Sequence, residues 1–166
     1  MGAIPYTEAA QTALAGFCAV GPEHRNCAQT MVMFAAMRLG DPPEICEIAR
    51  YLGGGIARQG KICGVLTGTA LAVGLKDSPR ATGACTHSEA TAAEAQDHLR
   101  ALFHDFRIEF GGTNCTQLTG YDLSTPEGLA GFRGSDARKK CALMLAWAME
   151  RLEALFDSYH EPQKCV

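Results

Sequence analysis

Apolar side chains recur every three or four residues along most of this chain, which is the spacing of one face of an α-helix. The pattern predicts a helix that begins after Asn26 and ends at Gly40, and a long helix with a polar outer face over residues 88–110. A last helix is expected to begin at Ser135, a residue type that favours the N-cap position. No pair of segments shows the alternation and turn residues of a β-hairpin. The sequence therefore predicts an all-α fold.

Shorter elements are expected between these helices. Residues 44–52 (EICEIARYL) follow a proline and predict a helix that the glycines at 53–55 stop. Its inward residues are expected to be Ile45, Ile48, Ala49 and Leu52. Loop signals are expected from Pro126, Gly128, Gly131 and Gly134. The whole is expected to be a compact bundle of about five or six helices in one domain over residues 1–166, with a disordered tail at 160–166.

A glycine stripe marks the expected central helix, which is predicted from about Lys61 to Gly74. Its members are Gly60, Gly64, Gly68 and Ala72, spaced four residues apart. Because glycine inside a helix costs up to about 1 kcal/mol relative to alanine, such a stripe needs a reason. Close helix packing is one reason, and the approach of a cofactor beside Cys63 is another. The two are compatible.

Composition and charge narrow the range of partners. The net charge is −3 and no basic block occurs, which argues against a nucleic-acid partner. No apolar run reaches the ~20 residues that span a bilayer, and the first residues lack the pattern of a secretory signal. We therefore expect a cytoplasmic protein without membrane insertion.

Residues 55–62 (GIARQGKI) resemble a phosphate-binding loop until the last position, where Ile62 replaces the Ser or Thr that holds magnesium. The preceding segment also has the helical period rather than that of a strand. Nucleotide binding is therefore not expected here. Arg58 and Lys61 are two cations close to Cys63, where they would favour a thiolate or an anionic cofactor.

The eight cysteines carry the candidate chemistry, since in a reducing compartment they indicate metal binding or redox activity rather than structural disulfides. The pattern N-C-x-Q occurs at residues 26–29 and again at 114–117. In both places Asn is a good N-cap, and the cysteine, Cys27 or Cys115, falls at the first helical position. The helix dipole there is expected to lower the thiol pKa.

These cysteine segments, together with GGGIARQGKICGVLTG, Gly120, Asp122 and Cys141, resemble the redox-active protein family named for its C…CGAxxG…C…C pattern. The resemblance covers roughly residues 10–155 and places the four family cysteines on Cys27, Cys63, Cys115 and Cys141. The CGAxxG element falls on residues 63–68, where Val65 replaces the family's alanine. What the family implies is redox activity.

Four hypotheses follow. The leading one is that Cys27, Cys63, Cys115 and Cys141 converge and ligate an iron–sulfur cluster for electron transfer to a redox partner protein. Gly60, Gly64, Gly68 and Arg58 would lie against that cofactor. The second is a thiol–disulfide oxidoreductase or redox sensor with Cys27 or Cys115 as the nucleophile. The third is a structural Cys₄ zinc site, and the fourth is a helical interaction domain with buried thiols. The sequence leaves open whether the chain forms a homodimer.

The remaining cysteines have simpler interpretations. Cys18 and Cys46 are expected to pack beside their helices, Cys85 to lie exposed in a loop, and Cys165 to lie in the terminal tail. His24, three residues before Cys27, is a candidate to flank the site.

Overall fold

The computed structural model describes residues 7–78 and 89–158. Their helices are α1 (Glu8–Cys18), η1 (Gly21–Glu23), α2 (Cys27–Leu39), η2 (Pro43–Leu52), α3 (Gly64–Lys76), α5 (Glu89–Phe110), α6 (Cys115–Thr119), α7 (Pro126–Arg133) and α8 (Ala137–Ser158). The described residues form no strand, so the predicted all-α fold is confirmed. Cys85, Cys165 and the tail at 160–166 lie outside the described residues.

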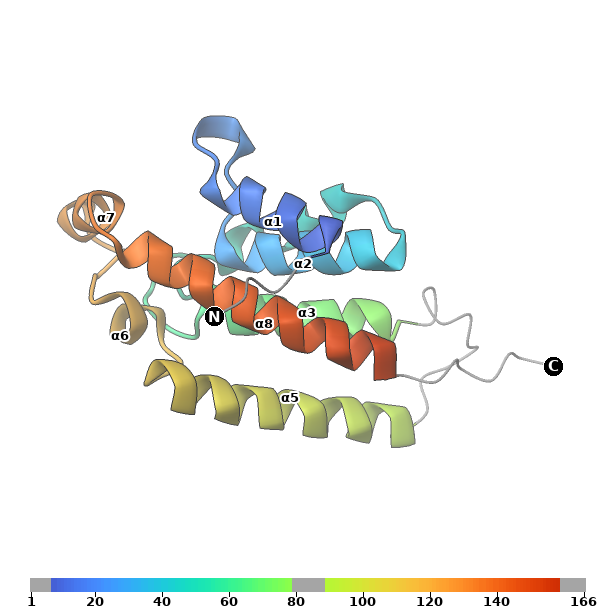
Figure 1. The fold of residues 1–166 in the computed structure, drawn as a ribbon. Coiled ribbons are helices and arrows are strands. Elements are labelled where there is room, and N and C mark those ends of the chain that lie inside the picture. The colour runs from blue at the N-terminus through green and yellow to red at the C-terminus, as the bar shows by residue number, and fades with distance from the viewer. Residues whose placement is uncertain (1–6, 79–88, 159–166) are drawn as a thin grey trace, which may run out of the picture.

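Helix α2 lies between α1, η2 and α3, and α8 crosses the bundle beside them (Figure 1). The side chain of Asn26 accepts hydrogen bonds from the backbone N–H groups of Ala28 and Gln29, and the Gln29 side chain accepts one from the backbone N–H of Asn26. This is the reciprocal capping box, and it confirms the predicted helix start. Gly40 ends the helix in the left-handed conformation, with φ of 72°.

The glycine stripe packs α3 closely against α2. A Cβ atom on Gly68 would lie 2.8 Å from the carbonyl oxygen of Ala28, and one on Gly64 would lie 3.2 Å from the Ala28 backbone nitrogen. Close packing is therefore the physical reason for these two glycines. The helix begins at Gly64 rather than near Lys61, so Gly60 belongs to the preceding turn and not to the stripe.

The segment 43–52 is helical but has the 3₁₀ form, which changes its inward face. With three residues per turn, Cys46 and Ala49 align and are buried. The prediction that Ile48 faces inward is wrong, because that residue lies on the next face and is 67% exposed. Tyr51, three residues further on, is 76% exposed.

Residues 126–133 form α7, where loop signals led us to expect a loop. Thr125 accepts a hydrogen bond from the backbone N–H of Gly128, and Pro126 occupies the start of the helix, where its missing N–H costs nothing. The Ser135 hydroxyl accepts a hydrogen bond from the backbone N–H of Ala137, the first residue of α8, so this helix begins two residues after the predicted start.

Helix α5 lies on the side of α3 and α8 that faces away from α1 (Figure 1). The rings of Phe106 and Phe110 on α5 lie 5.7 and 5.6 Å from that of Trp147 on α8, both edge to face. Together with Leu102 and Leu145 they belong to the main apolar core. None of the helices in the described ranges has both the length and the apolar character needed to cross a membrane.

Candidate functional site

The four family cysteines stand at helix starts that face one another. Cys27 is the first residue of α2, Cys63 is the N-cap of α3, Cys115 is the first residue of α6, and Cys141 lies in the first turns of α8. Negative charge on any of the other three thiols would raise the pKa of Cys27, which places all four in one electrostatic neighbourhood. Segments as far apart as residues 27 and 141 thus meet at one end of the bundle.

A short antiparallel bridge brings Cys63 next to Cys115. Ile62 pairs with Asn114, so that the backbone N–H of Cys63 donates to Thr113 O at 2.8 Å and the N–H of Cys115 donates to Lys61 O at 2.7 Å. The bridge satisfies two backbone N–H groups at the helix starts. It also holds Cys63 and Cys115 in a fixed register relative to each other.

Glycines allow this close approach. Gly60 has φ of 68°, and a Cβ there would lie 1.9 Å from Oγ1 of Thr116, so only glycine lets this turn lie against α6. A Cβ on Gly64 would lie 3.1 Å from the Cβ of Cys27. Gly60, Gly64 and Gly68 are therefore packing residues around the cysteines, and the pocket described below is lined by other residues.

Cys27 and Cys141 are the two thiols that most affect each other's pKa values. The neighbouring Cys27 thiol lowers the pKa of Cys141, and the nearby Arg138 guanidinium lowers it further. The Cys141 thiol and burial raise the pKa of Cys27 well above its ordinary value. The two thiols therefore titrate as a pair in which Cys141 loses its proton first.

Cys63 and Cys115 behave in the opposite way. Burial raises the pKa of Cys63 to about 12 and that of Cys115 to about 11. The prediction that helix starts give Cys27 and Cys115 lowered pKa values is wrong, because the Cys141 thiol and burial raise the pKa of Cys27 and burial raises that of Cys115. Arg58 and Lys61 are not among the groups that shift the pKa of Cys63. Over residues 7–78 and 89–158, no three His, Cys, Asp or Glu side chains are arranged to hold a metal ion.

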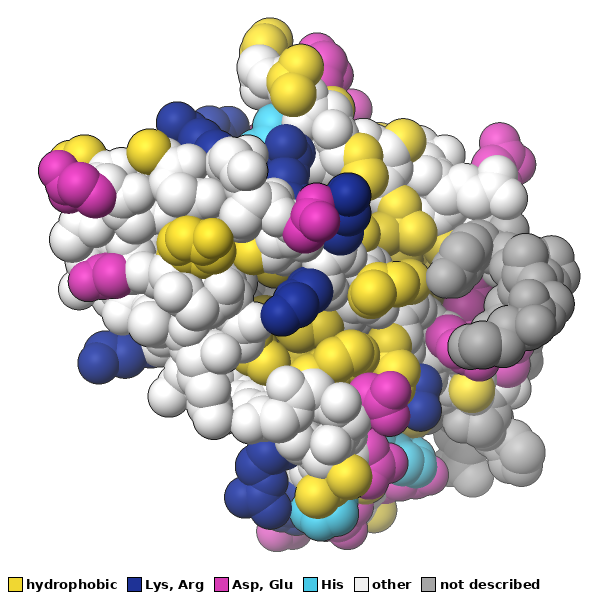
Figure 2. Space-filling model, turned by 60° about the vertical axis from the view of Figure 1, so that its left-hand side comes forward, with side chains coloured by type: hydrophobic (Ala, Val, Ile, Leu, Met, Phe, Trp, Pro, Cys, Tyr) yellow, Lys and Arg dark blue, Asp and Glu magenta, His cyan; other side chains and the backbone are white. Residues whose placement is uncertain are grey.

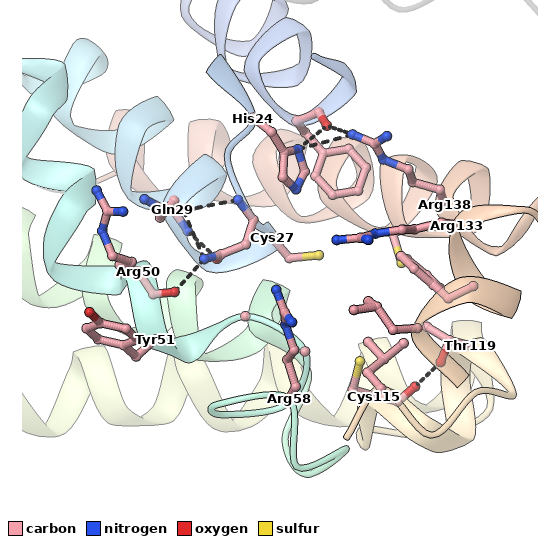
Figure 3. A pocket seen from close by; sticks show the side chains of 18 of the residues that line it. His24, Cys27, Gln29, Arg50, Tyr51, Arg58, Cys115, Thr119, Arg133 and Arg138 are labelled. Carbon is pink, nitrogen blue, oxygen red and sulfur yellow. Dashed lines mark hydrogen bonds between the residues drawn. The ribbon is translucent and has the colours of Figure 1, made fainter. Parts of the chain in front are cut away.

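A pocket of about 1040 Å³ opens in front of Cys27, Cys115 and Cys141. Its charged lining consists of Arg50, Arg58, Arg133 and Arg138, and no Asp or Glu is among its lining residues. In Figure 2, which turns this end of the molecule forward, dark blue side chains border a yellow apolar region in the middle of the face. The guanidinium groups of Arg58 and Arg133 point into the space that the Cys27 sulfur enters (Figure 3).

Arg138 connects this pocket to the end of α1. Its Nη2 donates to the backbone oxygens of Phe17 at 2.6 Å and Ala19 at 2.9 Å, and lies 3.1 Å from Nδ1 of His24. Burial, with Arg138 next, lowers the pKa of His24, so this imidazole is neutral near pH 7. His24 therefore lies in the wall of the pocket, where the sequence had placed it as a candidate to flank the site.

Arg58 reaches the pocket from a backbone turn with an uncommon conformation. Five successive residues, Gly54 to Arg58, have positive φ, including Ile56 at 62° and Arg58 at 62°. A left-handed residue with a side chain costs roughly 1–2 kcal/mol, and β-branched isoleucine is among the least suited to it. Backbone hydrogen bonds hold the turn, among them Gly60 N–H to Gly54 O at 3.0 Å. Strain of this kind is concentrated at functional sites.

The sequence pointed to some of these residues and missed others. Arg58 was predicted beside the site and lines the pocket. Arg138 was missed, although its position three residues before Cys141 places both on one helix face. Arg133 lies in the unpredicted α7 and had no such signal. Cys46 is buried as expected, whereas Cys18, expected to pack, is exposed because Phe17 takes the inward position.

Comparison with protein families matches residues 25–155 to the family described as "Putative redox-active protein (C_GCAxxG_C_C)". The chain belongs to this family. The description writes the central element as GCAxxG, whereas the sequence around Cys63 in this member reads ICGVLTG (residues 62–68). Comparison with curated proteins and with solved structures gives no match. Family membership supports redox activity and assigns no substrate or metal.

Proposed function

We propose that this protein carries out thiol–disulfide exchange with Cys27 and Cys141 as its redox pair. The proposal is carried by the placement of these two thiols: Cys27 on α2 and Cys141 on α8 line one open pocket, and each is the neighbour that most shifts the pKa of the other. A disulfide between them needs Cα atoms within about 7 Å.

The two thiols have different roles. Cys27 is only half-buried and its sulfur projects into the pocket, while Cys141 is 4% exposed. We therefore assign the first attack to Cys27 and the base role to Cys141. As the Cys27 sulfur bonds to one sulfur of a substrate disulfide, its proton passes to the Cys141 thiolate, and the other substrate sulfur leaves as a thiolate.

The second step completes the two-electron transfer. The Cys141 sulfur loses its proton and attacks the Cys27 sulfur of the mixed disulfide, so that the second substrate thiolate leaves and a Cys27–Cys141 disulfide forms. The substrate disulfide gains the two electrons that the protein dithiol loses, the Cys141 proton is released to the solvent, and the two substrate thiolates take up protons from the solvent. Arg138 stabilises the negative charge on Cys141 before each step.

Stopped-flow reaction with 2-hydroxyethyl disulfide tests this order. In the background Cys18→Ser/Cys85→Ser/Cys165→Ser, the reduced protein should release two equivalents of 2-mercaptoethanol. In the same background, Cys141→Ser should release one equivalent and stop at a mixed disulfide on Cys27, and Cys27→Ser should release none. Cys63→Ser and Cys115→Ser are the matched controls and should react like the parent. Trapping of the mixed disulfide on Cys63 or Cys115 would contradict the assignment.

A second candidate is an iron–sulfur cluster on the four family cysteines, whose thiols act on one another electrostatically but are not arranged to hold a metal ion as they stand in the described structure. Four thiolates suit such a cluster, which would supply one-electron transfer when bound. Iron and sulfide analysis after anaerobic purification distinguishes the candidates. A cluster requires stoichiometric iron that is lost in Cys63→Ser and Cys115→Ser, whereas exchange alone requires none.

A further inference from the structure

We propose that the pocket above Cys27 selects small disulfides that carry carboxylate groups or other anionic groups. The inference rests on the proposed exchange reaction and adds the substrate class. It depends on the charge and placement of arginines rather than on the state of any thiol.

The first observation is the unbalanced charge of the lining. Four arginines line the pocket and no acidic side chain does. Arg50 is paired with Glu47, and Arg138 is held by backbone oxygens of α1. Among the described residues, Arg58 and Arg133 have no ion pair, and both are exposed. They are therefore the two charges available to a ligand.

The second observation is the direction of these two side chains. Arg58 comes from the turn after η2 and Arg133 from the last turn of α7, yet their guanidinium groups converge near the Cys27 sulfur (Figure 3). Two like charges facing one pocket repel each other, and an anion between them removes that repulsion. Guanidinium groups also bind carboxylates with two parallel hydrogen bonds, which fixes the ligand's orientation.

The third observation is the positive-φ turn that presents Arg58. Arg58 itself has φ of 62°, and it follows Ile56 and Ala57 at 62° and 49°. A turn without strain would place fewer residues with side chains at positive φ. The chain therefore keeps an unfavourable backbone conformation at the point where Arg58 enters the pocket. The pocket volume of about 1040 Å³ leaves room for a small organic disulfide.

Three disulfides of different charge test the proposal. They are 3,3′-dithiodipropionate with two carboxylates, uncharged 2-hydroxyethyl disulfide, and cystamine with two ammonium groups. Each rate with the reduced protein is divided by the rate of the same disulfide with dithiothreitol, which corrects for the leaving group. The corrected rate should be at least about 10-fold higher for the dicarboxylate than for cystamine, and the ratio should fall with added salt.

The variant Arg58→Gln/Arg133→Gln should remove this preference. Arg107→Gln/Lys140→Gln removes the same charge from exposed positions outside the pocket and should keep it. Circular dichroism confirms that both variants are folded. Equal corrected rates for the three disulfides in the parent would overturn the anion preference and leave the exchange reaction intact.

A probe that cannot react separates the two claims. 3,3′-Thiodipropionate has the carboxylates but a thioether in place of the disulfide. Calorimetry should show that it binds the parent protein and Cys27→Ser, and not Arg58→Gln/Arg133→Gln. If no disulfide reacts but this probe binds, the exchange function is wrong and the anion site stands. If the probe does not bind, the anion site is wrong.

Discussion

At the residue scale, the four family cysteines fall into two classes that the sequence could not separate. Cys27 and Cys141 affect each other's pKa values most strongly, and the pKa of Cys141 is lowered. Cys63 and Cys115 are buried, with pKa values near 12 and 11. A cysteine with a pKa of 11 has about 100-fold less thiolate at neutral pH than one at 9. The pKa of Cys27 is raised as well, but the neighbouring Cys141 thiolate can accept its proton, so reactivity is expected only in the first pair.

Thiol labelling at pH 7.5 tests this division. In a background of Cys18→Ser, Cys85→Ser and Cys165→Ser, N-ethylmaleimide should first modify the Cys27–Cys141 pair. Cys63 and Cys115 should react at least about 100-fold more slowly, because little thiolate is present and the sulfurs are buried. Peptide mass spectrometry over time identifies each site. Modification of Cys63 or Cys115 as fast as the pair would refute the assignment.

At the element scale, the approach of α3 to α2 is what brings Cys63 to Cys27. Gly64 and Gly68 remove the side chains that would separate these helices, and Gly60 does the same between the turn at 54–60 and α6. The 3₁₀ form of η2 then directs the chain into that turn. The glycine-rich segment therefore serves the cysteine site through backbone packing.

Two glycines in the same helix offer a matched test of that packing. Gly68→Ala should lower the free energy of unfolding by about 1–3 kcal/mol, because the new Cβ would lie 2.8 Å from Ala28 O and the backbone must move. Gly74→Ala, with nothing within 4 Å of its Cβ, should raise it by up to about 1 kcal/mol. Urea unfolding measures both. Stabilisation by both substitutions would show that the helices do not pack as closely as described.

At the scale of the whole molecule, helix periodicity predicted the all-α fold. The neighbourhoods of two helix starts were also predictable, because Asn26 and Ser135 accept hydrogen bonds from backbone groups only two residues away. The 3₁₀ form of η2 and the formation of α7 were missed, because tertiary packing overrides weak local signals such as Gly128 and Gly131. The thiol pKa values were also beyond the sequence. They depend on burial and on contacts between residues far apart in the chain.

Buried thiols also make the stability of the fold depend on pH. The folded state keeps the protons of Cys63 and Cys115 up to pH about 12 and 11, whereas the unfolded chain loses them near pH 9. Their contribution to the free energy of unfolding is therefore complete below pH 9 and is lost as the pH rises further. Each thiol adds up to about 1.4 kcal/mol per pH unit to the decline.

Urea unfolding from pH 8 to 10.5 measures that decline. The control is Cys63→Ala/Cys115→Ala, which removes both groups and should show a shallower fall with pH, whatever its stability at pH 8. Parallel curves for the parent and the control would contradict the raised pKa values.

The most direct measurement is the identity of the disulfide that forms when the reduced protein is oxidised. In the background Cys18→Ser/Cys85→Ser/Cys165→Ser, one equivalent of 2-hydroxyethyl disulfide is added, the reaction is stopped with acid, and unreduced peptides are mapped by mass spectrometry. We predict one cross-link, between the peptides that contain Cys27 and Cys141. A cross-link that instead pairs Cys63 with Cys115, or the absence of any cross-link, would contradict the redox pair on which this account depends.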